Sequence, residues 1–305
     1  MLRYLVTGGA GFIGSNLVDA LLAAGHGVRV LDDLSTGKRE NLSPGAELLV
    51  ADVADAAATV DAMSGMDGCF HLAAIASVLR STEDWCGTHR VNLSGTIAVL
   101  DAARRHGRLP VVYASSAAVY GDTDGAVASE DLRCMPLTAY GADKYGCELH
   151  AAAGWHVHRL PAFGLRFFNV YGRRQDPMSP YSGVISVFAA RLAAGLPITV
   201  HGDGGQSRDF IHVSDVVAHL QAAMRVLAEA PGTYVCNVCT GCETNVATLA
   251  ALLGEVLGST RSVGQGPARA GDIRRSVGDA SRAVKTLGVS AKIALRDGLR
   301  DLVGT

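Results

Sequence analysis

Residues 7–14 read Thr7-Gly8-Gly9-Ala10-Gly11-Phe12-Ile13-Gly14 and directly follow the short apolar run Tyr4–Val6. The three glycines at positions 8, 11 and 14 have the spacing of a loop that turns tightly from a strand into a helix and lets a pyrophosphate approach the backbone. The N–H groups at the start of the following helix attract such an anion. The stretch therefore predicts a dinucleotide-binding loop. The residues expected to contact the cofactor are Gly8, Gly11, Phe12, Ile13 and Gly14.

An acidic residue, Asp32, ends the next apolar run, 18 residues after Gly14. A carboxylate at this point accepts hydrogen bonds from the ribose hydroxyls of adenosine and repels a 2′-phosphate. NAD rather than NADP is therefore the expected cofactor. The alternative is that Asp32 only caps the following loop. Asp52 and Val53 end a third run and are expected near the adenine.

Short apolar runs alternate with helical patterns through the first third of the chain, at residues 28–31, 48–50, 69–72 and 111–114. Runs that are apolar on both faces and separated by helices indicate buried parallel strands. The expected fold class is α/β, with a Rossmann-type doubly wound parallel sheet. After about residue 170 short strands mix with helices, which predicts a smaller mixed α/β substrate domain. We place the NAD-binding domain at 1–169, with later segments returning to it, and the substrate domain at 170–305.

The overall composition excludes several classes of protein. Among 305 residues, 27 Lys and Arg stand against 29 Asp and Glu, so the chain has no net positive charge with which to hold nucleic acid. The hydrophobic fraction of 49% excludes a disordered chain. No run approaches the roughly 18 apolar residues of a membrane span, and no targeting segment is recognisable, so a cytoplasmic protein without a membrane partner is expected.

Seven cysteines in a chain of this kind do not indicate a disulfide framework. Cys236, Cys239 and Cys242 have a spacing that could serve a metal, but no fourth cysteine or histidine lies nearby in the sequence. No metal is therefore expected.

A tyrosine and a lysine stand four residues apart, at Tyr140 and Lys144, on one face of a predicted helix. A free tyrosine has a pKa near 10, so a tyrosine base at pH 7 needs about 4 kcal/mol of added preference for the phenolate. Lys144 and a positively charged nicotinamide can supply this preference. Upstream, the run Tyr113–Gly121 predicts a strand that ends at Ser115 and Ser116.

Together with the segment Arg166–Gly172, these motifs stand in the order found in the extended short-chain dehydrogenase/reductase family of NAD-dependent epimerases and dehydratases. The chain resembles that family over essentially its whole length. The resemblance implies that Ser116, Tyr140 and Lys144 are the catalytic residues, and that Tyr140 and Lys144 also contact the cofactor. It further implies that Asn92 lies close to the cofactor and that Asn169 grips a substrate diphosphate. In many relatives the helices that correspond to residues 85–106 and 140–153 pair across a dimer, so a homodimer is expected.

Within the family, the sequence is most similar to UDP-hexose 4-epimerases. Dehydratases and some decarboxylases of the family place an acid directly after the catalytic serine, where this chain has Ala117 and Ala118. The resemblance therefore favours a UDP-sugar substrate that is oxidised and reduced again at one carbon. The residues that it assigns to the nucleotide are Arg208 and Arg269 at the diphosphate, Asp272 at the ribose, and Thr199 and His201 at the uracil.

A position four residues after Asp272 gates the sugar pocket in such relatives, and here it is Ser276. A small side chain leaves room for an acetamido group, so interconversion of UDP-GlcNAc and UDP-GalNAc is expected beside that of UDP-Glc and UDP-Gal. The alternative for Ser276 is that it only faces outward on a strand. UDP-glucuronate 4-epimerase, another nucleotide-sugar oxidoreductase and a catalytically inactive NAD-sensing protein remain open for the chain as a whole.

Overall fold

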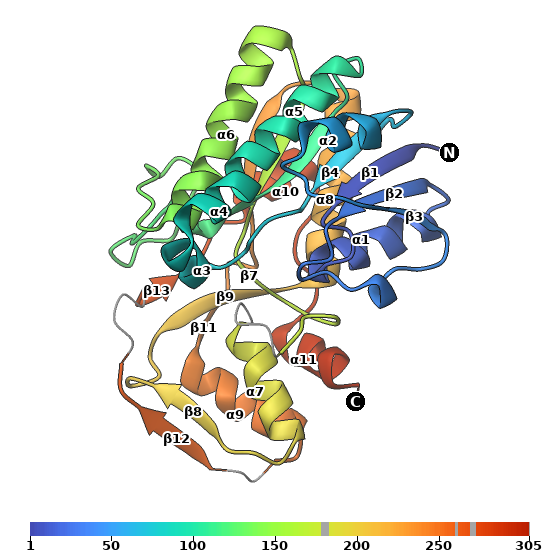
Figure 1. The fold of residues 1–305 in the computed structure, drawn as a ribbon. Helices are drawn as coiled ribbons and strands as arrows, with labels where there is room; N and C mark the ends of the chain where they lie inside the picture. The colour runs from blue at the N-terminus through green and yellow to red at the C-terminus, as the bar shows by residue number, and fades with distance from the viewer. Residues whose placement is uncertain (178–182, 260–261, 269–272, 305) are drawn as a thin grey trace.

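The computed structural model describes residues 1–177, 183–259, 262–268 and 273–304. Its main element is a seven-stranded sheet in the upper part of Figure 1, in which every pair of neighbouring strands is parallel. In spatial order its strands are β10 (Thr233–Val238), β6 (Ala162–Phe167), β5 (Val111–Ser116), β4 (Gly68–His71), β1 (Arg3–Thr7), β2 (Gly27–Asp32) and β3 (Ala46–Val50). The prediction of a doubly wound parallel sheet is confirmed.

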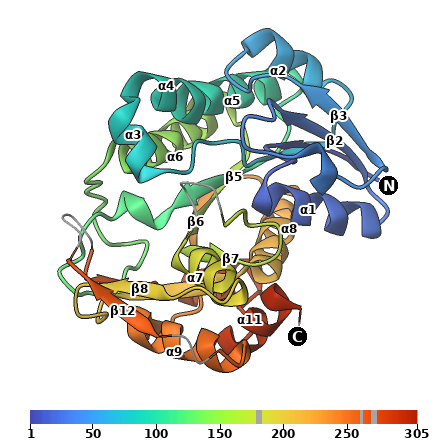
Figure 2. The same ribbon diagram turned by 60° about the horizontal axis from the view of Figure 1, so that its bottom comes forward.

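Helices cover both faces of this sheet. One face carries α1 (Phe12–Ala23), α8 (Val213–Glu229) and α10 (Ser281–Leu287), which bury apolar side chains against the strands in one core. The other face carries α2 (Ala56–Met63), α5 (Gly95–Arg105) and α6 (Ala139–His158) over a second core. Figure 2 shows α5 and α6 on one side of the sheet and α1 and α8 on the other. The strands other than the edge strand β3 are thus largely covered on both sides, which explains their apolar sequence.

Two short helices, α3 (Val78–Glu83) and α4 (Trp85–His89), follow β4. A single π-helical turn, Arg90–Ser94, then joins α4 to α5. Single-turn helices with 3₁₀ geometry cover Arg39–Asn41 and Ala117–Val119.

A smaller unit lies below the large sheet in Figure 1. Its central strand is β9 (Ser207–His212), which pairs with β7 (Asn169–Tyr171), β11 (Glu243–Asn245) and β13 (Arg275–Ser276). A two-stranded parallel sheet, β8 (Ile198–His201) with β12 (Val263–Gly266), and the helices α7 (Val184–Ala193), α9 (Val246–Val256) and α11 (Leu295–Val303) complete it. Although β10 and α8 come later in the chain than β7, they pack with the large sheet. The division at residues 169 and 170 stays a prediction.

The strand order places a topological switch point between β1 and β4, because the chain continues from β1 to β2 on one side and returns to β4 on the other. Ligands of open α/β sheets bind at the carboxyl ends of the strands flanking such a point. Within the described part of the chain, no helix is long and apolar enough to cross a membrane.

Candidate active site

The loop after β1 is shaped by two glycines that tolerate no side chain. Gly8 has a φ of +68°, and a Cβ atom there would lie 2.6 Å from the backbone nitrogen of Ala73. A Cβ atom on Gly14 would lie 2.1 Å from the carbonyl oxygen of Gly8. The N-cap residue of α1 is Gly11, so no side chain caps the first turn. The loop and the start of α1, with Phe12 and Ile13, thus form a close-fitting backbone cradle suited to an anion.

Asp32 lies beside this cradle at the end of β2. Its carboxylate accepts hydrogen bonds from the backbone N–H groups of Ala10 and Leu34, each at 2.9 Å. Burial raises the pKa of this carboxyl group, whereas the two backbone hydrogen bonds lower it. The Asp32 carboxylate is therefore held in one orientation against the glycine loop, where a ribose diol would be recognised.

The third strand brings two further predicted residues to the same edge. Asp52 forms an ion pair with Arg90 at 2.6 Å and accepts a hydrogen bond from the N–H of Ala54 at 2.8 Å. Val53 is buried in the core beneath α5. Val53 therefore contributes to the hydrophobic core. That Asp52 or Val53 contacts adenine stays a prediction.

Asn92 is fully buried in the π-helical turn. Its side-chain oxygen accepts a hydrogen bond from the N–H of Ile75 at 2.8 Å, and its Nδ2 donates to the carbonyl of Ile75 at 3.2 Å. Ile75 follows β4, in the segment that also touches Gly8 through Ala73. Both ends of the Asn92 amide therefore fix the loop that forms one wall of the cradle.

The predicted catalytic residues come together where α6 meets the end of β5. Thr138 caps α6 by accepting a hydrogen bond from the N–H of Gly141 at 3.1 Å, which places Tyr140 in the first turn. Lys144, one turn later, is 3% exposed, and its Nζ donates to the carbonyl of Ala114 at 3.0 Å. The Nζ also lies 5.9 Å from the centre of the Tyr140 ring.

The two serines at the end of β5 differ in their surroundings. Ser115 is 2% exposed, and its hydroxyl donates to Glu148 at 2.5 Å. Ser116 is half-buried, and its Oγ accepts a hydrogen bond from the N–H of Ala118 at 3.2 Å. Because the Ser115 hydroxyl is buried and already donates to Glu148, Ser116 is the more suitable serine to assist Tyr140.

In the smaller unit, β9 brings three predicted substrate residues to one sheet. Arg208 lies on β9 and stands in register with Ser276 on β13. Its Nη1 donates to the carbonyls of Ser207 and Ile273, at 2.8 and 2.7 Å. Asn169 begins β7, where it pairs with Phe210 of β9.

The remaining predicted substrate residues lie elsewhere. Thr199 and His201 belong to the separate sheet of β8 and β12, where His201 contacts the carbonyl of Pro267 at 3.1 Å. Arg269 and Asp272 lie outside the described residues.

Comparison with known proteins identifies this arrangement. The model of the NAD dependent epimerase/dehydratase family matches residues 4–239. The chain belongs to this family.

A UDP-glucose 4-epimerase of Mycolicibacterium smegmatis is 40% identical over 99% of this chain and 97% of its own length. The crystal structure of the UDP-glucose 4-epimerase of Thermotoga maritima with UDP-glucose has a TM-score of 0.94 at 34% identity, covering 99% of this chain and 98% of that one. A UDP-N-acetylglucosamine 4-epimerase of Methanobrevibacter ruminantium, in complex with UDP-N-acetylmuramic acid, has the same TM-score at 32% identity, with coverages of 99% and 97%. Proteins named for decarboxylation and dehydration of nucleotide sugars also match, at 33% identity.

The predictions of the family, of an isomerase-type enzyme and of NAD as cofactor are confirmed. The residues at the switch point fit this cofactor of the epimerase/dehydratase family. The backbone of the Gly8–Gly14 loop packs too closely for a Cβ atom at Gly8 or Gly14, as a tight turn into the N-terminus of α1 requires, and the Asp32 carboxylate lies beside this loop.

The sequence analysis missed His71, which ends β4 beside the cradle. It is buried, and its ring nitrogens contact the hydroxyls of Thr7 at 2.7 Å and Thr96 at 2.9 Å. Burial, reinforced by the charge of Lys144, lowers the pKa of His71 to about 3, so its ring is neutral. The sequence feature that could have predicted its role is a histidine at the end of an otherwise apolar strand.

Asp209 of β9 was also missed. Its buried carboxylate accepts hydrogen bonds from the N–H and hydroxyl of Thr240, at 2.8 and 2.7 Å, and from the N–H of Gly241 at 2.8 Å. It thereby holds the turn after β10 against the smaller unit. In that turn the Cys239 thiol is buried, which raises its pKa, whereas Cys242 is exposed. Among the described residues, no cluster of histidine, cysteine and acidic side chains could hold a metal ion.

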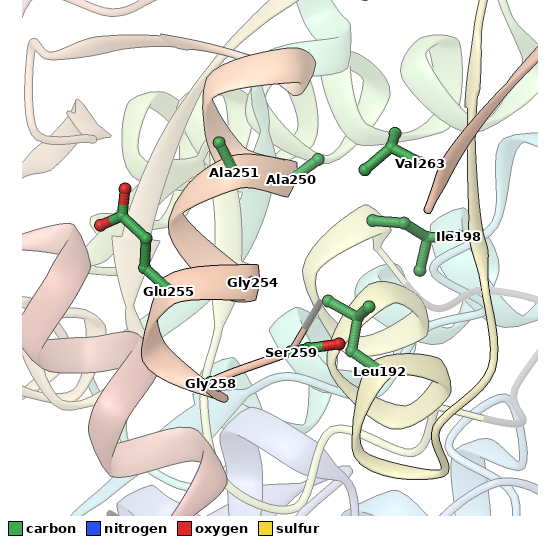
Figure 3. Close-up of a pocket in the computed structure, with 9 residues that line it drawn as sticks. All are labelled: Leu192, Ile198, Ala250, Ala251, Gly254, Glu255, Gly258, Ser259 and Val263. Atoms are coloured by element: carbon green, nitrogen blue, oxygen red, sulfur yellow. The ribbon is translucent and has the colours of Figure 1, made fainter. Parts of the chain in front are cut away.

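An apolar hollow of about 510 Å³ lies in the smaller unit, away from these residues. Figure 3 shows Ala250 of α9 pointing toward Ile198 and Val263, while the carboxylate of Glu255 points away from them. Glu255 instead forms an ion pair with Arg296 at 2.6 Å. This lining offers no cationic group to a nucleotide diphosphate, so the candidate active site is the one at the switch point.

Proposed function

We propose that the protein is an NAD-dependent UDP-hexose 4-epimerase. It interconverts UDP-GlcNAc with UDP-GalNAc, UDP-Glc with UDP-Gal, or both pairs, through a 4-keto sugar. The observation that carries the proposal is the meeting of Tyr140 and Lys144 with the serine-bearing end of β5, where Ala117 and Ala118 provide no acid. The matches to 4-epimerases over the whole chain support it.

NAD would be held by the glycine loop at its pyrophosphate, by Asp32 at its adenosine ribose, and by Tyr140 and Lys144 near its nicotinamide. The chemistry it supplies when bound is the reversible acceptance of a hydride, which no side chain can provide.

The protein's own part in the reaction is to move a proton at the 4-oxygen of the sugar. Tyr140 as phenolate takes the proton of the 4-hydroxyl and later returns it to the 4-keto oxygen, with Ser116 sharing the hydrogen bond. Lys144 stabilises the phenolate as a buried cation, and the neutral His71 behind it adds no competing charge. Between the two proton transfers the sugar must turn over, so the nucleotide, gripped by Arg208 and Asn169, holds the intermediate.

A family dehydratase would need a further acid and base beside the triad. Both residues after Ser116 are alanines, so the geometry favours epimerisation over loss of water. Incubating the purified protein with UDP-Glc, UDP-GlcNAc and UDP-GlcA, and detecting C4 epimers by NMR, tests the proposal. Epimerisation of UDP-GlcA alone would favour a glucuronate epimerase, and tightly bound NAD without turnover would favour an NAD sensor.

We expect the protein as purified to carry NAD(H). Epimerisation has no net redox change and gives no reason for cofactor release, while Asp32 disfavours a 2′-phosphate. Extraction of the denatured protein and chromatography of the nucleotides measures this. An extract that contains only NADP(H) would contradict the role of Asp32.

Replacing Arg208 with alanine should weaken the binding of UDP as well as of UDP-sugars. A hydrogen bond from a guanidinium to phosphate contributes about 1.5–3 kcal/mol, or roughly a 10- to 150-fold change in Kd. Calorimetric titration with UDP measures the change. Arg296→Ala, which removes an exposed pair with Glu255, is the control. Equal UDP affinity in the wild type and Arg208→Ala would assign Arg208 to structure alone.

We also propose a homodimer formed through α4, α5 and α6. Large apolar side chains on these helices are exposed: Trp85 is 67% exposed, Leu149 55% and Val157 67%. Isolated exposed apolar residues are common, but several on neighbouring helices indicate a contact surface. Light scattering of the wild type and Leu149→Lys tests this, because a dimer should dissociate when charge enters its interface.

A further inference from the structure

A buried ion pair lies one turn beyond the predicted catalytic lysine. Glu148 of α6 accepts hydrogen bonds from Arg166 of β6, with Nε at 2.9 Å and Nη2 at 2.7 Å. Both side chains are about 5% exposed, and the Ser115 hydroxyl donates to the same carboxylate at 2.5 Å. The reaction proposed above uses none of these three groups directly.

The far side of Arg166 is also fully engaged. Its Nη1 donates to the hydroxyl of Tyr120 at 2.9 Å, and its guanidinium carbon lies 4.8 Å from the centre of the Tyr120 ring. The Tyr120 hydroxyl in turn donates to Asn237 of β10 at 2.6 Å. A buried ion pair recovers its desolvation cost only when its geometry is fixed by such additional bonds. The network therefore holds the Glu148 carboxylate in one position.

The placement of this pair relative to the catalytic residues carries the inference. Tyr140, Lys144 and Glu148 are spaced by four residues and share one face of α6. Two hydrogen bonds join that face to the end of β5, from Lys144 to the carbonyl of Ala114 and from Ser115 to Glu148. Lys144 is also expected to serve the cofactor. Of these two hydrogen bonds, the one from Ser115 to Glu148 involves no predicted catalytic residue.

We propose that the Glu148–Arg166 pair, acting through Ser115, is a positioning device that fixes the strand end carrying Ser116 against the helix face carrying Tyr140 and Lys144. Strand register reinforces this arrangement, because Ser115 and Arg166 are direct partners in the ladder of β5 and β6. Displacing reacting groups by about 1 Å can lower the rate as much as 100-fold, so holding β5 and α6 in a fixed relative position supports catalysis. The inference rests on the proposed epimerase function.

Ser115→Ala tests it, because it removes one hydroxyl and leaves the ion pair intact. We expect kcat to fall roughly 3- to 30-fold, with NAD content and the KM for UDP-sugar within about 2-fold of the wild type. The matched control is Tyr120→Phe, which removes a hydroxyl from the same buried network on the far side of Arg166. Thermal melting of both variants reports the loss of stability, which should be similar.

The result that supports the proposal is a loss of kcat in Ser115→Ala at least about threefold larger than in Tyr120→Phe. Any smaller difference, or a loss expressed in KM, would overturn it and leave the network a purely structural one. The wild type serves as the test of the proposed function. If it epimerises no UDP-sugar, the same comparison is made on the rate at which nucleotide sugar reduces the bound NAD, followed by NADH absorbance.

Discussion

The variant Tyr140→Phe is expected to bind NAD and UDP-sugar normally and to lose at least about 100-fold in turnover. The lower bound is the contribution of a positioned acid or base. Tyr140 is the group in the first turn of α6 that can carry the proton of the sugar hydroxyl, and its partner Lys144 is buried with Nζ 5.9 Å from the ring. The phenylalanine ring fills the same space as the tyrosine ring and Lys144 keeps its position, so the binding of NAD and UDP-sugar should be unchanged.

The measurement is kcat for C4 epimerisation, together with the NAD content and the UDP affinity of the variant. Tyr234→Phe is the matched control, because it removes a tyrosine hydroxyl outside the predicted catalytic residues, one that donates to the carbonyl of Ala230 at 2.9 Å. Its kcat should stay within about 2-fold of the wild type. Near-normal turnover of Tyr140→Phe would show that another group is the base.

The nucleotide half of the site was predictable from sequence because its determinants are local. Gly8 and Gly14 are required by the backbone of one loop, and Asp32 ends the adjacent strand. Tyr140 and Lys144 are one helical turn apart, so their spacing alone places them on one face. Apolar runs buried on both sides likewise predicted the parallel strands of the large sheet.

The buried polar partners were not predictable, because each pair joins residues that only the tertiary fold brings together. Glu148 and Arg166 meet across α6 and β6, and Tyr120 reaches Asn237 over 117 residues of sequence. A charged residue in a helical pattern is normally solvent-exposed, so Glu148 carried no signal of burial. His71 gave a weak signal only, since a histidine can end a strand for many reasons.

The predicted sugar-binding residues lie on strands that are far apart in the sequence, and only the structure shows which of these strands are neighbours. Ser276 lies on the two-residue strand β13 and stands beside Arg208 of β9. Residues that are direct partners in neighbouring strands present their side chains on the same face of the sheet, so Ser276 lies on the face of Arg208. A half-buried serine next to the predicted diphosphate-binding arginine is consistent with a place beside the sugar.

The variant Ser276→Tyr is therefore expected to lose roughly 5- to 150-fold in kcat/KM on UDP-GlcNAc relative to UDP-Glc. If Ser276 lines the C2 side of the sugar, the added ring occupies the space of an acetamido group, and overpacking of this kind costs about 1–3 kcal/mol. The UDP-Glc reaction is the internal control, because misfolding or loss of NAD would depress both reactions alike. Ser276→Ala should leave the ratio unchanged, since it adds no volume. If Ser276→Tyr lowers both rates together, or neither, Ser276 is not the gate of the sugar pocket.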